Sequence, residues 1–239
     1  MLNVFISGVE KQSGKTLVCA GLASTMQSLS YTTCVYKPVQ SNAIDMNGFK
    51  ISPDLSFIKK FDSNIVTQST YALCGSNSPF VSSYENGVKI DINAILAEYR
   101  SLHGGTDCNI LEGSNSISSP IAEYLTELDI VKTLKIPLVL VVNPKKTSID
   151  SVISAIKYIQ SEGVNILGFI VNQYDENFEN LEEKYFPQII KEYSNSNILG
   201  YLPDYGDISN LTPEILIDDV LNRINIEEVF QLKISKLQG

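Results

Sequence analysis

The segment that most constrains the fold is the loop from Gly8 to Thr16, which ends in the tripeptide Gly-Lys-Thr. An apolar stretch, 2–7, precedes this loop, and apolar residues at helical spacing follow it in 17–23. A strand, a glycine-bounded loop and a helix in this order place several backbone N–H groups and the positive end of the helix around one concavity. The segment therefore predicts a phosphate-binding loop, the alternative being a solvated turn with an incidental lysine.

Two side chains at the end of this loop have expected roles. Lys15 would supply positive charge to the outer phosphates, and the Thr16 hydroxyl is a natural ligand for Mg²⁺. The usual motif has four residues between its glycines, whereas five separate Gly8 from Gly14. This spacing departs from the general motif, and the strand and helix patterns on either side support the prediction.

Length and charge limit the classes of function. A chain of 239 residues suits one α/β domain, so we expect 1–239 to form a single domain. The net charge of −9, without a basic run, disfavours binding to nucleic acid or to an anionic membrane. The longest apolar run, 136–142, is too short to span a bilayer. Because the N-terminal residues lack the pattern of a signal peptide, we expect a cytoplasmic location.

The cysteines and the single histidine do not form the pattern of a structural zinc site. Cys19, Cys34, Cys74 and Cys108 show no CxxC spacing, and His103 is the only histidine. Each cysteine lies among apolar or small residues, which favours buried, reduced thiols.

Strand and helix patterns alternate along nearly the whole chain. Strands are expected at 2–7, 32–36, 108–111, 138–142, 166–172 and 198–203. Helices are expected at 53–61, 90–102, 121–134, 151–163, 181–193 and from 213, with a loop at 41–53 and irregular structure at 64–83. Right-handed βαβ units then give a mainly parallel sheet with helices on both faces. We predict a doubly wound, three-layer α/β fold of the phosphate-loop NTPase class.

Three charged residues stand at predicted element ends. Lys37 follows the strand 32–36, and the carboxyl ends of parallel strands carry the ligand crevice, so Lys37 would face the phosphate loop. Asp54 lies in the first turn of a helix, and Glu112 follows a buried strand. Either acid could hold Mg²⁺ beside the loop. The alternatives are a solvated lysine for Lys37, a helix-stabilising carboxylate for Asp54 and a surface acid that ends a strand for Glu112.

Together these motifs resemble the dethiobiotin synthetase family over most of the chain. That family opens with Gly-Thr-Asp-Thr-x-Val-Gly-Lys-Thr, which has the same five-residue gap. The segment 36–39, Tyr-Lys-Pro-Val, followed by Ser41, matches a segment of the family, as does Ser78-Pro79. Asp54 falls where the family has a metal-binding aspartate. The resemblance also includes an asparagine at the end of a strand, Asn172, and the run 199–203.

The resemblance implies an ATP- and Mg²⁺-dependent ligase that closes a ring by forming carbon–nitrogen bonds. The diamine 7,8-diaminononanoate takes up CO₂ as a carbamate, ATP phosphorylates the carbamate, and the second amine displaces phosphate to give dethiobiotin, a step of biotin biosynthesis. A homodimer is also implied, in which 146–149 contribute to the site of the other subunit.

The resemblance further implies the residues of the site. Lys15 and Lys37 would act in catalysis by flanking the charge of the carbamate and the γ-phosphate. Thr16, Asp54 and Glu112 would hold Mg²⁺. The nucleotide would contact Gln12, Ser13, Gly14, Lys15, Thr16, Leu17, Asp54, Glu112, Gly113, Ser114, Asn115, Asn172, Gln173, Pro203, Asp204 and Tyr205. In this set Asn172 would contact the adenine edge and 203–205 would line the base pocket. The substrate would contact Lys11, Ser41, Ser78 and Pro79.

Four positions depart from the family pattern. Lys11 replaces a small hydroxyl residue near the substrate, and 113–116 lacks two glycines of a Glu-Gly-Ala-Gly-Gly segment. Gln173 replaces an aspartate, and Asn210 stands where a glutamate is expected. These changes affect the identity of the acceptor more than ATP or metal binding. The alternatives are an ATPase switch of the MinD or ParA type, a phosphate-loop ligase for another amine or carboxylate, and a regulatory domain that binds nucleotide without chemistry.

Overall fold

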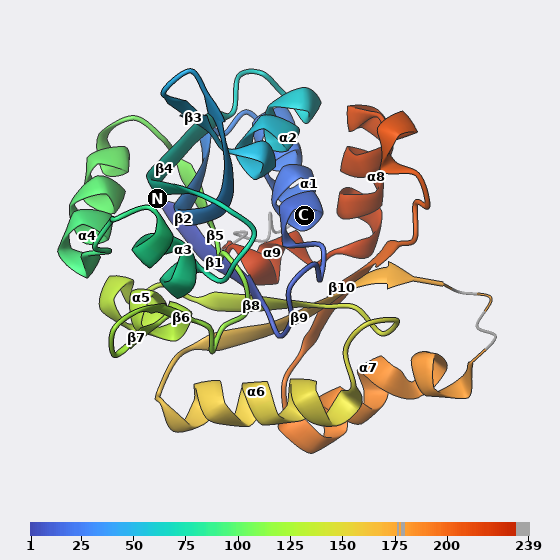
Figure 1. Cartoon of the computed structure of the whole chain (residues 1–239). Coiled ribbons are helices and arrows are strands. Elements are labelled where there is room, and N and C mark those ends of the chain that lie inside the picture. Colours follow the sequence, from blue (N-terminus) through green and yellow to red (C-terminus); the bar gives the residue numbers. More distant parts are fainter. Residues whose placement is uncertain (176, 178–179, 233–239) are drawn as a thin grey trace.

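The computed structural model describes residues 1–175, 177 and 180–232, and at its centre lies β1 (Leu2–Gly8). Within these residues, eight strands form one sheet in the order β10-β9-β8-β1-β5-β2-β3, with β4 paired to β2 (Figure 1). β1 pairs in parallel with β5 on one side and β8 on the other. A strand covered on both faces must be apolar throughout, which explains the run Val4, Phe5 and Ile6, each 0% exposed.

The strands of the main sheet are mostly parallel. Besides β1 they are β2 (Thr33–Met46), β3 (Phe49–Ile51), β4 (Val66–Cys74), β5 (Cys108–Glu112), β8 (Leu138–Val142), β9 (Ile166–Tyr174) and β10 (Ile198–Pro203). Only the pairing of β2 with β3 is antiparallel among the described strands of this sheet. A separate hairpin joins β6 (Pro120–Ala122) to β7 (Leu125–Thr126).

Helices cover both faces of the sheet (Figure 1). One face carries α1 (Lys15–Ser28), α2 (Pro53–Phe61), α8 (Pro213–Arg223) and α9 (Ile226–Val229). The other face carries α4 (Ile92–Ser101), α5 (Glu127–Leu134), α6 (Ile149–Ser161) and α7 (Leu181–Ser194), while α3 (Pro79–Glu85) packs near β6. Two 3₁₀ turns complete the described structure, Leu102–Gly104 and Ile208–Asn210. Alternate residues of β1 enter opposite cores, Val4 and Ile6 in one and Phe5 in the other. The predicted three-layer α/β fold is confirmed.

Strand β2 is longer than the sequence predicts, because Lys37 and Pro38 do not end it. Pairing with β5 stops at Tyr36, and the register with β4 passes from Lys37 to Val39. Pro38 therefore lies where its missing N–H breaks no ladder bond. The predicted loop at 41–53 is wrong, since β2 runs on to Met46 and turns into β3.

Two further predictions of local structure are wrong. Residues 64–83 are not irregular, because they contain β4 and the start of α3. Strand β4 pairs with the outer side of β2, and its many half-buried polar residues give no clear apolar alternation. The helix expected at 121–134 begins only at Glu127, since β6 and β7 occupy the residues before it and Tyr124 adopts a φ of 57°. The helical tail expected from 213 is observed as α8 and α9, and 233–239 lie outside the described residues.

Candidate functional site

The loop between β1 and α1 has the backbone shape of an anion site. Gln12 and Gly14 adopt left-handed conformations, with φ of 64° and 95°. Gly14 precedes α1 directly, and a Cβ at this position would overlap the Asn172 side-chain amide. Within the described chain, no side chain caps α1 and no acid lies in its first turn. The first N–H groups of the helix are therefore available to phosphate oxygens.

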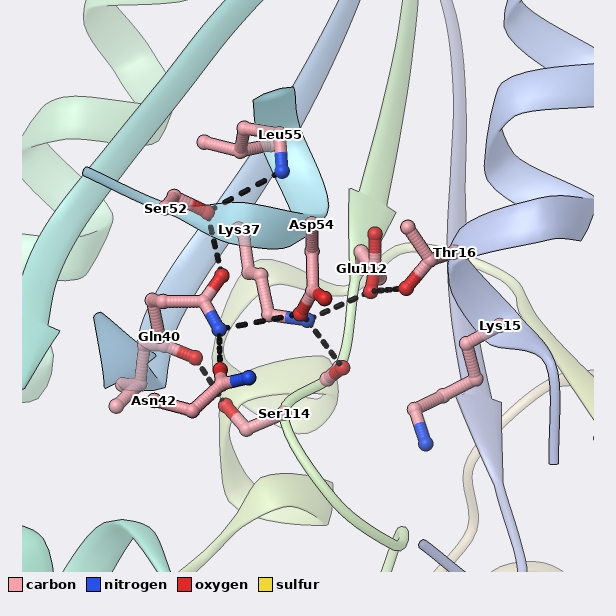
Figure 2. Close-up of polar contacts among 12 residues, drawn as sticks. Lys15, Thr16, Lys37, Gln40, Asn42, Ser52, Asp54, Leu55, Glu112 and Ser114 are labelled. Atoms are coloured by element: carbon pink, nitrogen blue, oxygen red, sulfur yellow. Dashed lines mark hydrogen bonds and ion pairs between the residues drawn. The ribbon is translucent and has the colours of Figure 1, made fainter. Parts of the chain in front are cut away.

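A buried cation at the carboxyl edge of the sheet joins three elements (Figure 2). Lys37 Nζ, on β2, lies 2.6 Å from Asp54 Oδ2 of α2 and 2.6 Å from Glu112 Oε1 at the end of β5. The side chains of Lys37 and Glu112 are 2% and 0% exposed. Lys37 Nζ also donates to the carbonyl oxygen of Gly113 at 3.4 Å. The structure thus brings Lys37, Asp54 and Glu112 together, as the sequence predicts.

The opposite charges in this cluster keep Lys37 protonated and Asp54 ionised. Burial alone would lower the pKa of Lys37, but the charges of Glu112 and Asp54 outweigh burial and raise this pKa above its ordinary value. Burial would raise the pKa of Asp54, but the charge and hydrogen bond of Lys37 outweigh it and lower that pKa. Lys37 is therefore a fixed ammonium at neutral pH and cannot serve as a proton acceptor.

The side-chain oxygen atoms of Thr16, Asp54 and Glu112 are of the kind that binds a magnesium ion. Thr16 Oγ1 donates to Glu112 Oε1 at 2.8 Å, so the predicted ligands Thr16 and Glu112 are neighbours. Among the described residues, Glu112 Oε2 is buried and accepts no hydrogen bond. A hydroxyl and two carboxylates are the hard oxygen donors that Mg²⁺ prefers, and Asp54 remains 27% exposed. The donor set therefore fits the ion that the sequence predicts.

Lys15 lies beside this cluster but does not join it (Figure 2). Its side chain is 6% exposed, and Nζ donates to the carbonyl oxygen of Asn115 at 2.5 Å. Burial lowers the pKa of Lys15, an effect that the nearby charge of Glu127 only partly offsets. Lys15 is thus a buried cation whose Nζ is bonded to a carbonyl oxygen of the loop after β5 and not to a carboxylate.

Asn172, near the carboxyl end of β9, is hydrogen-bonded to the phosphate loop. Its Nδ2 donates to the carbonyl oxygen of Ser13 at 3.0 Å. The other atom of the amide, Oδ1, is buried, and no described residue donates to it. Gln173 follows with a φ of 57°, and its side-chain oxygen accepts a hydrogen bond from Asn143. Asn172 therefore presents an acceptor next to the loop, while Gln173 is bonded to the end of β8.

The predicted base-pocket residues lie after β10 and are tied to two other elements. Asp204 Oδ2 forms an ion pair with Lys145 Nζ at 2.8 Å, across to the loop after β8. Tyr205 Oη donates to Asp219 Oδ2 of α8 at 2.9 Å. Pro203, the last residue of β10, is half-buried. These contacts place the segment 203–205 on the side of the sheet where β8, β9 and β10 end.

The predicted substrate residues are only partly brought together. Lys11 Nζ donates to the carbonyl oxygen of Ser76 at 3.1 Å, so the phosphate loop contacts the turn before Ser78 and Pro79, which begin α3. Ser41 lies farther along β2, and its side chain makes no hydrogen bond to the described residues. The structure therefore joins Lys11 to the segment of Ser78, and the contact of Ser41 with substrate stays a prediction.

Sequence reasoning missed two buried polar residues. Gln40 Nε2 donates to Asp54 Oδ2 at 3.1 Å, and Gln40 Oε1 accepts from Ser52, the residue that caps α2 (Figure 2). Gln40 thereby orients Asp54. The sequence predicts a strand that ends before Lys37 and Pro38, and so it does not place Gln40 on a buried strand. Glu127, 1% exposed, lies in the middle of the helix predicted at 121–134, whereas in the structure it is the first residue of α5.

Comparisons with known proteins agree with the sequence motifs. A family model described as an AAA domain, AAA_26, matches residues 3–212. The chain is 25% identical over 229 residues to the ATP-dependent dethiobiotin synthetase BioD of Bacillus subtilis (strain 168), covering 95% of this chain and 96% of the relative. It is 28% identical over 214 residues to the BioD of Clostridium novyi (strain NT), covering 87% and 89%. The predicted resemblance to dethiobiotin synthetases is confirmed.

Solved structures with the same fold carry other names. The septum site-determining protein MinD of Pyrococcus horikoshii OT3, complexed with Mg-ADP, aligns with a TM-score of 0.55 at 16% identity, covering 100% of this chain and 97% of that one. A ParA family ATPase from Chlorobium tepidum TLS aligns with a TM-score of 0.56 at 14% identity, covering 95% and 96%. At these identities the likeness shows the fold alone. No helix among the described residues is long and apolar enough to cross a bilayer.

Proposed function

This chain belongs to the AAA_26 family of AAA domains, and on that premise we propose that it is an ATP- and Mg²⁺-dependent dethiobiotin synthetase. The relatives carry that name and span nearly the whole chain, which supports the prediction of an ATP-dependent ligase. The observation that carries the proposal is the buried ammonium of Lys37 between Asp54 and Glu112, beside the phosphate loop. The proposed substrates are small molecules, namely ATP, CO₂ and 7,8-diaminononanoate.

The reaction needs two anions, a carbamate and the γ-phosphate of ATP, to approach each other. Their repulsion is reduced by cations that are in place before the transfer. Lys37 is such a cation, because its raised pKa keeps it charged and its two carboxylate partners fix its position. Lys15, at the start of α1, would contact the outer phosphates. Thr16, Asp54 and Glu112 would hold Mg²⁺, which would neutralise charge on the phosphate oxygens.

We propose that Asn172 sets the nucleotide preference. Its buried Oδ1 accepts no hydrogen bond from the described residues, and adenine carries an amino group where guanine carries a carbonyl oxygen. We therefore propose that ATP is preferred over GTP. Replacing Asn172 with alanine should reduce that preference by about tenfold or more, since a hydrogen bond to a buried acceptor contributes about 0.5–1.5 kcal/mol and its mismatch costs more. Competition of ATP and GTP for a fluorescent nucleotide measures this ratio.

The decisive experiment combines the protein with ATP, Mg²⁺, bicarbonate and diaminononanoate. Release of ADP should depend on the diamine, and dethiobiotin should form in equal amount. Diamine-independent hydrolysis would instead favour an ATPase switch, the alternative with which the fold is compatible. Lys37→Met should abolish coupled turnover and leave ATP binding within about threefold, whereas Lys15→Met should weaken both. Lys60→Met, on the exposed side of α2, is the matched control.

The acceptor is the part of the proposal that the departures from the family affect most. Lys11 brings a cation to the turn before Ser78, so another amine or carboxylate substrate is the second candidate. Comparing diaminononanoate with shorter diamines and with amino acids as triggers of ADP release separates the two.

We further propose that 1–239 acts as one domain in the cytoplasm and forms a homodimer, with 146–149 contributing to the site of the other subunit. The segment 146–149 runs from the loop after β8 to the first residue of α6, and it follows Lys145, which pairs with Asp204. Light scattering of the purified protein tests the dimer, and mixing of two inactive variants tests the shared site. We expect a mixture of Lys37→Met with a variant altered in 146–149 to regain activity.

A further inference from the structure

Glu127 is a buried carboxylate to which the proposed reaction assigns no role. It is the first residue of α5, and its side chain is 1% exposed. The helix does not need it as a cap, because Thr126 and Asp129 form a reciprocal capping pair, in which Thr126 N donates to Asp129 Oδ2 at 2.7 Å. A carboxylate is unfavourable in the protein interior unless it is hydrogen-bonded. The partners of Glu127 therefore indicate what it does.

These partners come from β1 and from the loop after β5. Ser7, on β1, donates its hydroxyl to Glu127 Oε1. Two consecutive backbone N–H groups donate to Oε2, that of Ser114 at 2.7 Å and that of Asn115 at 3.3 Å. A Cβ on Gly113 would overlap the carboxylate, so the loop and the side chain are in close contact. Two adjacent N–H groups of this kind form an anion-binding concavity, and here the protein fills it with its own carboxylate.

The same loop contacts Lys15 through its other polar group. The carbonyl oxygen of Asn115 accepts from Lys15 Nζ at 2.5 Å. The two bonds to Glu127 fix the peptide planes on either side of Ser114, and the Asn115 carbonyl belongs to the next plane, so Glu127 positions that carbonyl by restraining the backbone before it. Burial raises the pKa of Glu127, and the charge of Lys15 is the largest influence that opposes this rise. Lys15 is therefore drawn toward the loop by both a carbonyl dipole and a nearby carboxylate.

We propose that Glu127 is a positioning residue that acts on Lys15. It orients Asn115 so that the Asn115 carbonyl competes with the phosphates of ATP for the Lys15 ammonium, and it keeps the segment 113–115 in the place needed for turnover. Glu127 thus limits the affinity for ATP and supports the rate. The effect on rate rests on the proposed function, whereas the effect on affinity rests only on the phosphate loop.

Titration calorimetry with Mg-ATP, without diamine, tests the effect on affinity. Glu127→Gln keeps the shape of the side chain and removes its charge, and we expect it to bind ATP about tenfold tighter. Glu123→Gln, an exposed position on the preceding hairpin, is the matched control and should bind like the native protein. If Glu127→Gln does not fold, Glu127→Asp, which retracts the carboxylate from the loop, should tighten binding about threefold. Unchanged or weaker binding by a folded variant would overturn the proposal.

A double substitution tests whether Glu127 acts through Lys15. In a Lys15→Met background, Glu127→Gln should no longer tighten ATP binding, because the ammonium that the loop restrains is gone. Equal tightening in both backgrounds would mean that the carboxylate acts on the phosphates directly, and the positioning role would then be wrong.

Steady-state kinetics test the effect on rate. Glu127→Gln should lower kcat by about tenfold or more while lowering KM for ATP, because a neutral amide oxygen holds the two N–H groups more weakly than a carboxylate and the loop is less firmly placed. A purely structural residue would lower the melting temperature and leave the kcat and KM of the folded fraction unchanged, which would also overturn the proposal. If the native protein releases no ADP in response to the diamine, the proposed function fails, and the affinity measurements still decide the role of Glu127.

Discussion

Replacing Lys37 with methionine removes the cation that lies 2.6 Å from both Asp54 and Glu112. Methionine has a similar length, so the main loss is electrostatic. Removing one partner of a buried ion pair costs about 3–5 kcal/mol, and we expect the lower end of this range because Asp54 is 27% exposed. For a chain of this length, about 3 kcal/mol corresponds to a fall of roughly 6–12 °C in melting temperature.

The cost of this substitution should depend on pH with a defined sign. In the native protein the folded pKa of Asp54 is lowered, so its stabilisation is present above the unfolded value of about 3.9 and is lost as the pH falls through the folded pKa. In the variant, burial without a cation would raise the pKa of Asp54, so destabilisation appears as the pH rises above about 3.9. The deficit relative to the native protein should therefore be larger at about pH 7.5 than at about pH 4.5.

Urea unfolding of the native protein, Lys37→Met and Lys60→Met at both pH values measures this deficit. Lys60→Met should match the native protein within about 0.5 kcal/mol, as exposed substitutions usually do. Mg²⁺ should restore more stability to Lys37→Met than to the native protein, because the carboxylates of Asp54 and Glu112 no longer share an ammonium. An equal deficit at both pH values, together with no added effect of Mg²⁺, would refute the electrostatic account of this cluster.

Two further predictions concern the phosphate loop and the thiols. Gly14→Ala should abolish detectable ATP binding in calorimetry, because it combines a left-handed backbone with overlap of the Asn172 amide. Gly48→Ala, at a φ of 89° with open space around it, should cost the same strain of about 1–2 kcal/mol and leave ATP binding intact. In the folded protein at about pH 8, a thiol reagent should label Cys74, which is half-buried. Burial raises the pKa of Cys34 and Cys108 to about 12, so full labelling should require denaturant; mass spectrometry counts the adducts.

The central part of the fold could be predicted from the sequence because its signals are local and strong. The strands at 138–142 and 198–203 have the predicted bounds, since both are short apolar runs flanked by turn residues or proline. The segment 66–74 was missed for the opposite reason. Its residues are polar and half-buried, and only pairing with a distant strand, β2, makes it a strand.

Some residues of the candidate site could also be predicted from the sequence, and others could not. Lys37, Asp54 and Glu112 could be expected to meet, because each stands at an element end on the edge of the sheet where ligands bind. Gln40 and Glu127 could not be found in that way. The position of Gln40 depends on β2 continuing past a proline, and that of Glu127 depends on a hairpin that delays the start of α5. Both outcomes follow from contacts between segments rather than from any local pattern.

Among the described residues, only the nitrogen of the Asn172 amide has a hydrogen-bond partner. Under the proposed contact with adenine, this restricts how the chain could come to prefer guanine nucleotides. The amide nitrogen is bonded to Ser13 at 3.0 Å, so a half-turn of the side chain that offered a donor to guanine would release the phosphate loop. A shift toward guanine nucleotides would then require a new anchor for Ser13 before the amide could rotate. Base choice and loop shape would have to evolve together, through at least two coordinated substitutions.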